Sequence, residues 1–295
     1  MHLLQHGIQR CTTILQGLVF HLAGLTRGRT HADFRAGNVI PTANILSTLA
    51  ERDDRPARVI IVSSQAAAGP ASSDSEPVTE HDAPHPVERY GQSKLDAEQA
   101  AARFSQALPI VVVRPSAVYG PRARDFLAAF AQAAARIAVF ATPRDHRMSI
   151  VHVRDLVRAL ILAAEQPAAI GRTYFVANTD SVSWGELYAT IAAVARSSPL
   201  QVQLPRAVLE GAAALGDLYA LASGRTPLLT RNKVALASPR WWLCDASRIG
   251  AELGWKASVP LQDGVRETYL WYLAQGWLGG RSLAASTGPA EERSE

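Results

Sequence analysis

The stretch from Val59 to Arg122 decides the fold: it opens with VIIVSSQAAAG (59–69), reaches YGQSK (90–94) after a polar loop, and closes with IVVVRPSAVYGPR (110–122). VIIV and IVVV are wholly apolar runs, which is typical of strands buried on both faces. Such strands form parallel sheets covered by helices, in which ligands bind beyond the carboxyl ends of the strands. The sequence therefore predicts an α/β fold with a doubly wound parallel sheet.

Three side chains that follow these strands have complementary chemistry: Ser64, Tyr90 and Lys94. Positions i and i+4 share one face of a helix, so the ammonium of Lys94 is expected beside the group that the Tyr90 phenol contacts. A nearby positive charge favours phenolate and lowers the tyrosine pKa from its usual value of about 10. Ser64 can hold a substrate oxygen against that phenol. The predicted chemistry is proton transfer to oxygen, which becomes a redox reaction when a bound cofactor carries hydride.

The Tyr-x-x-x-Lys spacing is weak evidence by itself, but the chain has only three lysines, which makes a chance match improbable. The alternative is a surface Tyr and Lys on an amphipathic helix. Two serines at the end of one strand and RPSAVYGP at the end of the next favour a functional site.

Six further or overlapping segments share their order with one known family. They are VFHLAG (19–24), DFRAGNVIPTANIL (33–46), VSSQAAAG (62–69), RPSAVYGPR (114–122), SIVHVRDLVRA (149–159) and the segment 245–272. Together with YGQSK they resemble the extended short-chain dehydrogenases/reductases, also called the NAD-dependent epimerase/dehydratase family. The resemblance covers most of the chain.

This resemblance implies a Rossmann-like domain that binds NAD or NADP, a small-molecule substrate and a homodimer formed through a helix bundle. It implies that Tyr90 is the catalytic acid/base, that Lys94 tunes it and reaches the nicotinamide ribose, and that Ser64 orients the substrate. The cofactor-binding residues that it implies are Ala23, Gly24, Asn38, Ser63, Tyr90, Lys94, Pro115 and Val118.

One family element is missing from the sequence: no GxxGxxG or GxGxxG turn opens a helix. Such a turn holds the cofactor pyrophosphate with backbone amides and the helix dipole. Only residues 1–17 precede the strand at 18–22, whereas two βα units need about 60 residues. The chain is then either an amino-terminally truncated family member or a non-catalytic binding or scaffold protein that has lost cofactor binding. In a truncated sheet, strand 18–22 is an exposed apolar edge unless an amino-terminal helix over residues 3–15 covers it.

Length and composition set the outer limits. With 295 residues, 48% of them hydrophobic, the chain can bury a large core, and we expect a Rossmann-like domain over 1–180, a smaller, mostly helical substrate lobe over 181–283 and a disordered tail over 284–295. The formal charge of +4 is spread along the chain, which argues against nucleic-acid binding. Cys11 and Cys244 predict neither a disulfide framework nor a metal site. No targeting segment or membrane span is evident, so a cytoplasmic protein is expected.

Further elements are expected from periodicity and turn signals. The helix at 31–52 contains Pro41, which predicts a kink or a later start. The polar loop after Gly69 is expected to be a flap or a mobile linker at the substrate site. Further helices are predicted at 87–107, 125–138, 153–165, 183–195, 206–221 and 227–237.

The substrate class stays open. The family's dehydratases carry an Asp-Glu pair where this chain has Gln65 and Ala66, which makes a nucleotide-sugar dehydratase less favoured. A sugar-nucleotide epimerase and a hydroxysteroid-type dehydrogenase both fit the motifs. Trp241 and Trp242 can cap an apolar or ring-shaped substrate, although a structural anchor is the favoured interpretation.

Overall fold

A parallel sheet lies at the centre of the molecule. The computed structural model describes residues 12–15, 17–135, 137–223, 234 and 238–278. Within these residues, five strands form the main sheet in the order β1 (Thr12–Leu15), β2 (Leu18–His21), β3 (Arg58–Val62), β4 (Ile110–Pro115) and β9 (Thr173–Val176). Strands β2, β3, β4 and β9 are parallel, whereas β1 is antiparallel to β2. The predicted α/β class with a parallel sheet is confirmed.

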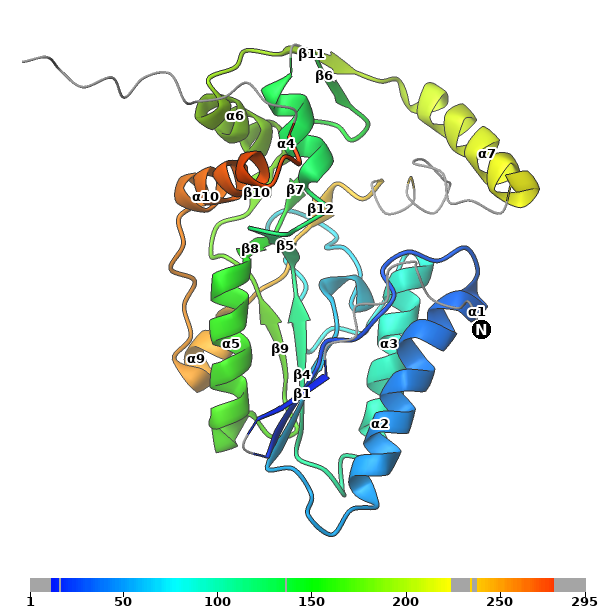
Figure 1. Ribbon diagram of the computed structural model, residues 1–295, viewed down its shortest axis with the longest axis vertical. Coiled ribbons are helices and arrows are strands. Elements are labelled where there is room, and N and C mark those ends of the chain that lie inside the picture. The colour runs from blue at the N-terminus through cyan, green and yellow to red at the C-terminus, as the bar shows by residue number, and fades with distance from the viewer. Residues whose placement is uncertain (1–11, 16, 136, 224–233, 235–237, 279–295) are drawn as a thin grey trace, which may run out of the picture.

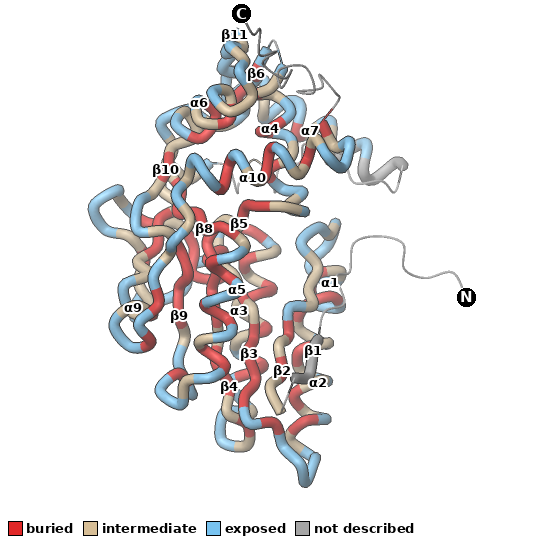
Figure 2. Tube along the Cα trace, turned by 60° about the vertical axis from the view of Figure 1, so that its left-hand side comes forward, coloured by how far each residue is buried: buried red, intermediate tan, exposed pale blue. Residues whose placement is uncertain are grey.

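Helices cover both faces of this sheet (Figure 1). α2 (Ile40–Ala50) and α3 (Arg89–Ala102) lie on one face, and α5 (Val153–Glu165) and α9 (Ser247–Leu253) lie on the other. Alternate residues of β3 enter different core clusters: Val59 and Ile61 pack on the α2 side and Ile60 packs on the α5 side. Figure 2 shows the buried strands β3 and β4 inside these layers. Their wholly apolar sequence follows from this burial on both faces.

The amino-terminal end of the sheet differs from the prediction. Thr12–Leu15 forms strand β1 in a tight hairpin with β2, in place of the carboxyl-terminal end of the helix expected over 3–15. Residues 3–11 of that prediction lie outside the described residues. The apolar edge of β2 is therefore covered, as expected for a stable sheet, but by an antiparallel strand. Backbone pairing in the hairpin overrides the helical spacing of the apolar residues.

The segment that contains Pro41 forms three consecutive helical pieces. α1 (His31–Phe34) leads into a π-helix, η1 (Arg35–Val39), and then into α2. Pro41 lies in the first turn of α2, where its missing N–H leaves no helix bond unmade. The helical segment begins at His31, as predicted, and the irregularity expected near Pro41 is the π-helix that precedes it; the alternative of a later start is wrong.

A second, mostly helical lobe lies above the sheet in Figure 1. Its apolar core gathers α4 (Leu127–Ala134), β6 (Ile137–Phe140), α6 (Trp184–Ala195) and α10 (Leu261–Ala274). A capping box opens α6, with Ser183 and Glu186 as partners. The helix expected at 125–138 ends at Ala134 because Ile137–Phe140 pairs with β11 (Leu200–Gln203).

Short elements complete the described chain. They are η2 (Gln65–Ala67), β5 (Ala117–Tyr119), β7 (Arg147–Met148), β8 (Ile150–His152), η3 (Pro167–Ala169), β10 (Val182–Ser183), α7 (Arg206–Ser223) and β12 (Trp241–Trp242). β12 pairs with β7, and Ala71 N donates to Trp241 O, so the tryptophan pair anchors secondary structure. None of the described helices has the length and apolar character of a membrane span.

The two lobes alternate along the chain. Residues 127–140 lie in the core of the helical lobe, whereas Ile249, Leu253 and Trp255 return to the core beside the sheet. The division at residue 180 stays a prediction. The first segment precedes residue 180 but packs in the helical lobe, and the second follows residue 180 but packs beside the sheet. The helix expected at 227–237 and the tail at 284–295 lie outside the described ranges, apart from Val234.

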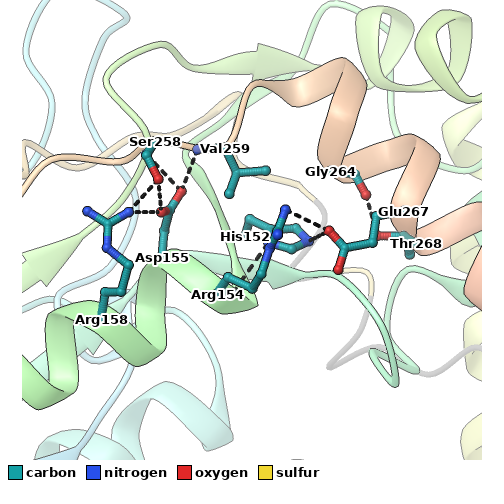
Figure 3. A network of polar contacts seen from close by, with 9 residues as sticks. All are labelled: His152, Arg154, Asp155, Arg158, Ser258, Val259, Gly264, Glu267 and Thr268. Atoms are coloured by element: carbon teal, nitrogen blue, oxygen red, sulfur yellow. Dashed lines mark hydrogen bonds and ion pairs between the residues drawn. The ribbon is translucent and has the colours of Figure 1, made fainter.

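Asp155 ties the two lobes together (Figure 3). Its buried carboxylate accepts hydrogen bonds from Ser258 N at 3.0 Å, Ser258 Oγ at 2.9 Å, Val259 N at 2.9 Å and Arg158 Nη1 at 2.8 Å. Asp155 lies in the first turn of α5, and residues 258–259 lead directly into α10. Its role is structural, as its place near a helix start suggests.

The polar loop after Gly69 is pinned to the sheet. Val78 bridges to Cys244, Glu80 Oε1 accepts from Phe175 N at 2.7 Å, and His85 N donates to Ala68 O at 2.9 Å. These contacts anchor the loop at three points, and its role as a flap or mobile linker at the substrate site stays a prediction.

Candidate active site

Ser64 and Tyr90 meet at the carboxyl end of β3. Ser64 follows the strand and caps η2, with its Oγ accepting from Ala66 N at 3.1 Å. Tyr90 lies in the first turn of α3, where the Glu88 carboxylate accepts from Tyr90 N at 2.6 Å. The Ser64 side chain lies close enough to the Tyr90 phenol to lower its pKa. The predicted convergence of the hydroxyl and the phenol is present in the structure.

A glycine permits this approach of α3 to the strand end. A Cβ at Gly91 would lie 2.2 Å from Ala66 O, and a backbone atom cannot yield that much space. Gly91 follows Tyr90 directly, so it lets the first turn of α3 pack against the turn that begins at Ser64.

Lys94 lies one helical turn after Tyr90 and is buried. Its Nζ donates to Val62 O at 2.9 Å, and a Cβ at Gly24 would lie 3.2 Å from this Nζ. Val62 ends β3, and Gly24 follows β2 by three residues. The ammonium therefore lies between the carboxyl ends of two neighbouring parallel strands, where ligands bind in such sheets.

Burial dominates the proton affinities of this pair. It lowers the pKa of Lys94 to about 8, with the Glu98 carboxylate acting in the opposite direction. Burial also raises the pKa of Tyr90 to about 12, and the nearby Ser64 side chain offsets this only in part. The expectation that Lys94 lowers the pKa of Tyr90 is wrong for this structure, because the ammonium is directed at Val62 O and the phenol is desolvated. Tyr90 therefore carries its proton at neutral pH and is poised as an acid.

Asn38 in the π-helix fixes the segment after β2. Its Oδ1 accepts from Leu25 N at 2.5 Å, and its Nδ2 donates to Leu25 O at 3.1 Å and to Ser93 Oγ at 2.7 Å. Both amide protons are thus used to join the Gly24–Leu25 turn to α3. A direct contact of Asn38 with a cofactor stays a prediction.

His21, at the end of β2, is linked to Asn38 through Thr42. Thr42 Oγ1 donates its one proton to Asn38 O at 2.7 Å, so the 3.0 Å contact with His21 Nε2 requires His21 to be the donor. Burial, with a smaller contribution from the Lys94 charge, lowers the pKa of His21 to about 4. His21 is therefore neutral, with its proton on Nε2, under ordinary conditions.

Two charged residues that the sequence analysis missed lie behind the site. Glu98 forms an ion pair with Arg114 at 2.6 Å and accepts a hydrogen bond from Ser63 Oγ. The signal was present in the spacing, because Glu98 follows Lys94 by four residues on the same helix face. Ser63, a predicted cofactor-binding residue, thus donates to a protein carboxylate in this structure.

The remaining predicted cofactor contacts follow neighbouring strands. Ala23 and Gly24 follow β2, and the buried Pro115 ends β4. Val118 lies on β5 and packs against the core cluster beside α5. The first three therefore lie at the ligand-binding edge of the sheet, and their contact with a cofactor stays a prediction.

Three buried polar atoms near this edge of the sheet lack a hydrogen-bond partner within the described residues. They are Gln65 Nε2, Ser116 Oγ and Asn178 Oδ1. Gln65 follows β3, Ser116 follows β4, and Asn178 follows β9. Buried polar groups are generally satisfied by protein, water or ligand, so these atoms fit an edge that receives a polar ligand.

Comparison with known proteins agrees with this geometry. The chain is 25% identical over 258 residues to ceramide reductase of Caulobacter vibrioides (strain NA1000 / CB15N), covering 88% of this chain and 74% of that protein. Among solved structures, UDP-glucuronic acid 4-epimerase from Bacillus cereus, in complex with UDP-glucuronic acid and NAD, matches with a TM-score of 0.70 at 19% identity, over 88% of this chain and 76% of that one. RMD from Pseudomonas aeruginosa, complexed with NADPH, matches with a TM-score of 0.70 at 22% identity, over 88% and 82% of the two chains.

The model of the family described as "NAD dependent epimerase/dehydratase family" matches residues 12–177. This match spans the main sheet, Ser64 after β3 and the helix α3 that carries Tyr90 and Lys94. Because it covers more than half of the sequence, the chain belongs to the NAD-dependent epimerase/dehydratase family.

Proposed function

We propose that this protein is an NAD(P)-dependent oxidoreductase or epimerase that acts on a secondary alcohol or ketone. The observation that carries the proposal is the meeting of Ser64, Tyr90 and Lys94 at the carboxyl end of β3. A phenol, a hydroxyl and an ammonium at one strand end are suited to moving a proton to or from a substrate oxygen.

The strand ends fit the nicotinamide side of a dinucleotide. Gly24 has no side chain, and a Cβ there would lie 3.0 Å from Asn38 Oδ1 and 3.2 Å from Lys94 Nζ, so any larger residue would crowd the ammonium. Lys94 and Tyr90 would hold the nicotinamide ribose, with Ala23 and Gly24 allowing the close approach. A bound nicotinamide supplies or accepts the hydride. NAD and NADP both remain suitable, as the complexes of the two solved structures illustrate.

Each side chain then has a separate task. Tyr90, protonated at neutral pH, donates its Oη proton to a carbonyl oxygen during reduction and recovers a proton when an alcohol is oxidised. Ser64 holds the same oxygen by a hydrogen bond. Lys94 places a positive charge beside the site, where it favours an anionic oxygen over a neutral one.

The substrate is a small molecule with a secondary alcohol or ketone, and two classes have support. Similarity to a UDP-sugar epimerase structure supports a sugar nucleotide, and similarity to ceramide reductase supports a more lipid-like or hydroxysteroid-like substrate. Ser64, Tyr90 and Lys94 are proposed to contact only the reacting carbon and its oxygen. They therefore fit a sugar nucleotide and a lipid-like or hydroxysteroid-like substrate equally.

Cofactor binding and turnover test the proposal. Purified protein is titrated with NADH and NADPH by fluorescence and then assayed with UDP-glucose, UDP-glucuronic acid, a hydroxysteroid and a long-chain keto lipid. We expect saturable binding in the micromolar range and turnover with one substrate class. Absence of binding to both dinucleotides would overturn the proposal.

The second candidate is a non-catalytic binding or scaffold protein of the same family. Such a protein would keep the fold of the family without binding NAD or NADP. The NADH titration separates the two candidates, because a scaffold that has lost cofactor binding gives no saturable signal.

We also propose that the protein forms a homodimer through α2 and α3. A hollow of about 430 Å³ lies between the outer faces of these helices, lined by Arg35, Val39, Ile40, Ala43, Asn44, Asp96, Gln99, Ala100 and Arg103. Ile40 on this face is 43% exposed. Sedimentation equilibrium tests the dimer, and Ile40→Asp is expected to convert it to a monomer.

A further inference from the structure

α3 contacts three successive residues at the end of β3, one contact per helical turn. Tyr90 meets Ser64, Lys94 donates to Val62 O at 2.9 Å, and Glu98 accepts from Ser63 Oγ. The helix residues are spaced by four, so they share one face. Glu98 is thus the third member of a row whose other two members belong to the proposed site.

The Glu98 carboxylate is held in a buried ion pair. Its side chain is 10% exposed and that of Arg114 is 7% exposed. Arg114 Nε donates to Oε1 at 2.9 Å and Nη2 donates to Oε2 at 2.6 Å, which is the two-pronged geometry of a guanidinium with a carboxylate. Arg114 also lies over the ring of Phe175, 5.6 Å from its centroid. This geometry fixes the position of both oxygens.

A gain in folding stability alone does not explain why this ion pair is buried. Removing two charges from water costs several kcal/mol per ion, and well-packed apolar residues often serve a core as well or better. Glu98 Oε1 has a second partner in Ser63, which directly precedes Ser64. Its charge also favours the charged form of Lys94, against the effect of burial.

We propose that Glu98 is a positioning residue: its carboxylate fixes the end of β3 that carries Ser64 and supplies the negative charge that accompanies Lys94 in the interior. Arg114 orients that carboxylate. This assignment rests on the proposed function for its chemical meaning. The effect of Glu98 on the protonation of Lys94 can be measured without turnover.

The test is titration of the Lys94 ammonium by NMR in protein labelled with ¹³C and ¹⁵N in lysine. The chain has only three lysines, so assignment needs only Lys94→Arg and Lys256→Arg variants. We expect Glu98→Gln, which keeps the side-chain size and removes the charge, to move the Lys94 midpoint to lower pH. Asp96→Asn is the matched control, since Asp96 is on the same helix but bonds to Gln92 Nε2 at 2.8 Å, and it should titrate as wild type.

Glu98→Gln leaves the Arg114 guanidinium buried without its partner charge, which threatens folding. The double variant Glu98→Gln/Arg114→Met removes both charges and is expected to show a smaller downward shift of the Lys94 midpoint, because loss of the Arg114 cation offsets part of the effect. A wild-type midpoint in whichever of these variants folds would overturn the proposal.

Kinetics give a second readout if the protein turns over a substrate. We expect Glu98→Gln to lower kcat about 100-fold, with KM changed less, as misplacement by about 1 Å does in positioned sites. The pH limb of kcat that follows Lys94 should move with the NMR midpoint. If the wild-type protein has no turnover, the proposed function fails while the titration still decides the role of Glu98. A normal pH profile beside a shifted midpoint would overturn the link to catalysis.

Discussion

The proton of Tyr90 is the residue-scale feature on which the proposed chemistry depends. Burial keeps the pKa of this phenol at about 12, so its acid form is present across the physiological range. An acid beside a carbonyl favours reduction, whereas alcohol oxidation needs the phenolate. The resting site therefore holds the acid form, and oxidation of an alcohol first requires Tyr90 to lose its proton.

Replacing Tyr90 by phenylalanine removes this proton and little else. We expect turnover to fall about 10²- to 10⁴-fold, the usual contribution of a positioned acid or base, with NADH affinity nearly unchanged. Steady-state rates and fluorescence titration measure the two quantities. Tyr174→Phe is the control, because Tyr174 bonds to Glu252 on the other side of the sheet. Wild-type turnover in Tyr90→Phe would remove Tyr90 from its assigned role.

His21 predicts a loss of stability in mild acid. Its pKa is about 4 in the folded protein and about 6.5 when unfolded, so between these values the unfolded chain binds more protons. The free energy of unfolding therefore falls as pH drops from about 6.5 to 4, by up to about 3 kcal/mol from this residue. Urea unfolding at pH 7 and pH 4.5 measures the change. His21→Gln keeps a donor for Thr42 and should flatten this pH dependence; an unchanged slope would contradict the assignment.

Sequence spacing predicted which side chains meet but not how they ionise. Ser64, Tyr90 and Lys94 follow from strand ends and an i, i+4 pair, which are local patterns. The raised pKa of Tyr90 and the lowered pKa of Lys94 come from burial by other segments, and no local pattern reports burial of that kind. The same i, i+4 spacing could have identified Glu98, which follows Lys94 by four residues.

At the scale of elements, the approach of α3 to η2 depends on Gly91. Gly91→Ala would place a Cβ 2.2 Å from Ala66 O, so the helix has to shift. We expect a loss of about 1 to 3 kcal/mol of stability, together with reduced turnover because Tyr90 moves away from Ser64. Denaturant unfolding and activity assays measure both.

A second glycine in a helix provides the control. A Cβ at Gly211 in α7 would meet nothing within 4 Å. Gly211→Ala is expected to stabilise the protein by about 0.5 to 1 kcal/mol, since alanine is the better helix former. Equal effects of the two substitutions would contradict the packing role of Gly91.

Element boundaries were predicted less well where pairing across the chain decides the structure. β1 and β6 are strands because a partner strand lies beside them, and the apolar spacing of each segment alone suggested a helix. The π-helix at Arg35–Val39 follows from Asn38 reaching Leu25 and Ser93, contacts that join three separate segments. By contrast, α5 and α6 carry their own caps and periodicity and were predicted within a few residues.

For the whole molecule, Asp155 is a buried polar tie between the lobes described above. Asp155→Ala would leave the N–H groups of Ser258 and Val259 without their acceptor, beside the segment that leads into α10. We expect a loss of about 3 to 5 kcal/mol and earlier proteolysis between the lobes. Arg158→Ala is the control; its side chain is 51% exposed and should change stability by less than about 1 kcal/mol. Similar losses in both variants would contradict the tie.

The overall α/β architecture was predictable because it needs only two buried strands and the helices between them. The interleaving of the lobes was not, because residues 127–140 and 241–255 find their cores through contacts with distant segments. Changes in composition along the sequence predict a single boundary between the lobes, whereas the chain passes from one lobe to the other more than once.

The reversed direction of β1 sets a border on the surface that receives ligands. β2, β3, β4 and β9 bring their carboxyl ends to one rim, but β1 brings its first residue there, since Thr12 pairs with His21. A long ligand that lies along this rim contacts the carboxyl ends of parallel strands only as far as β2. Beyond β2, its distal half lies beside the amino-terminal end of β1. Substitutions at Leu22, the residue that follows β2, should then alter the affinity for that distal half while the reacting carbon, held near Tyr90, keeps its rate.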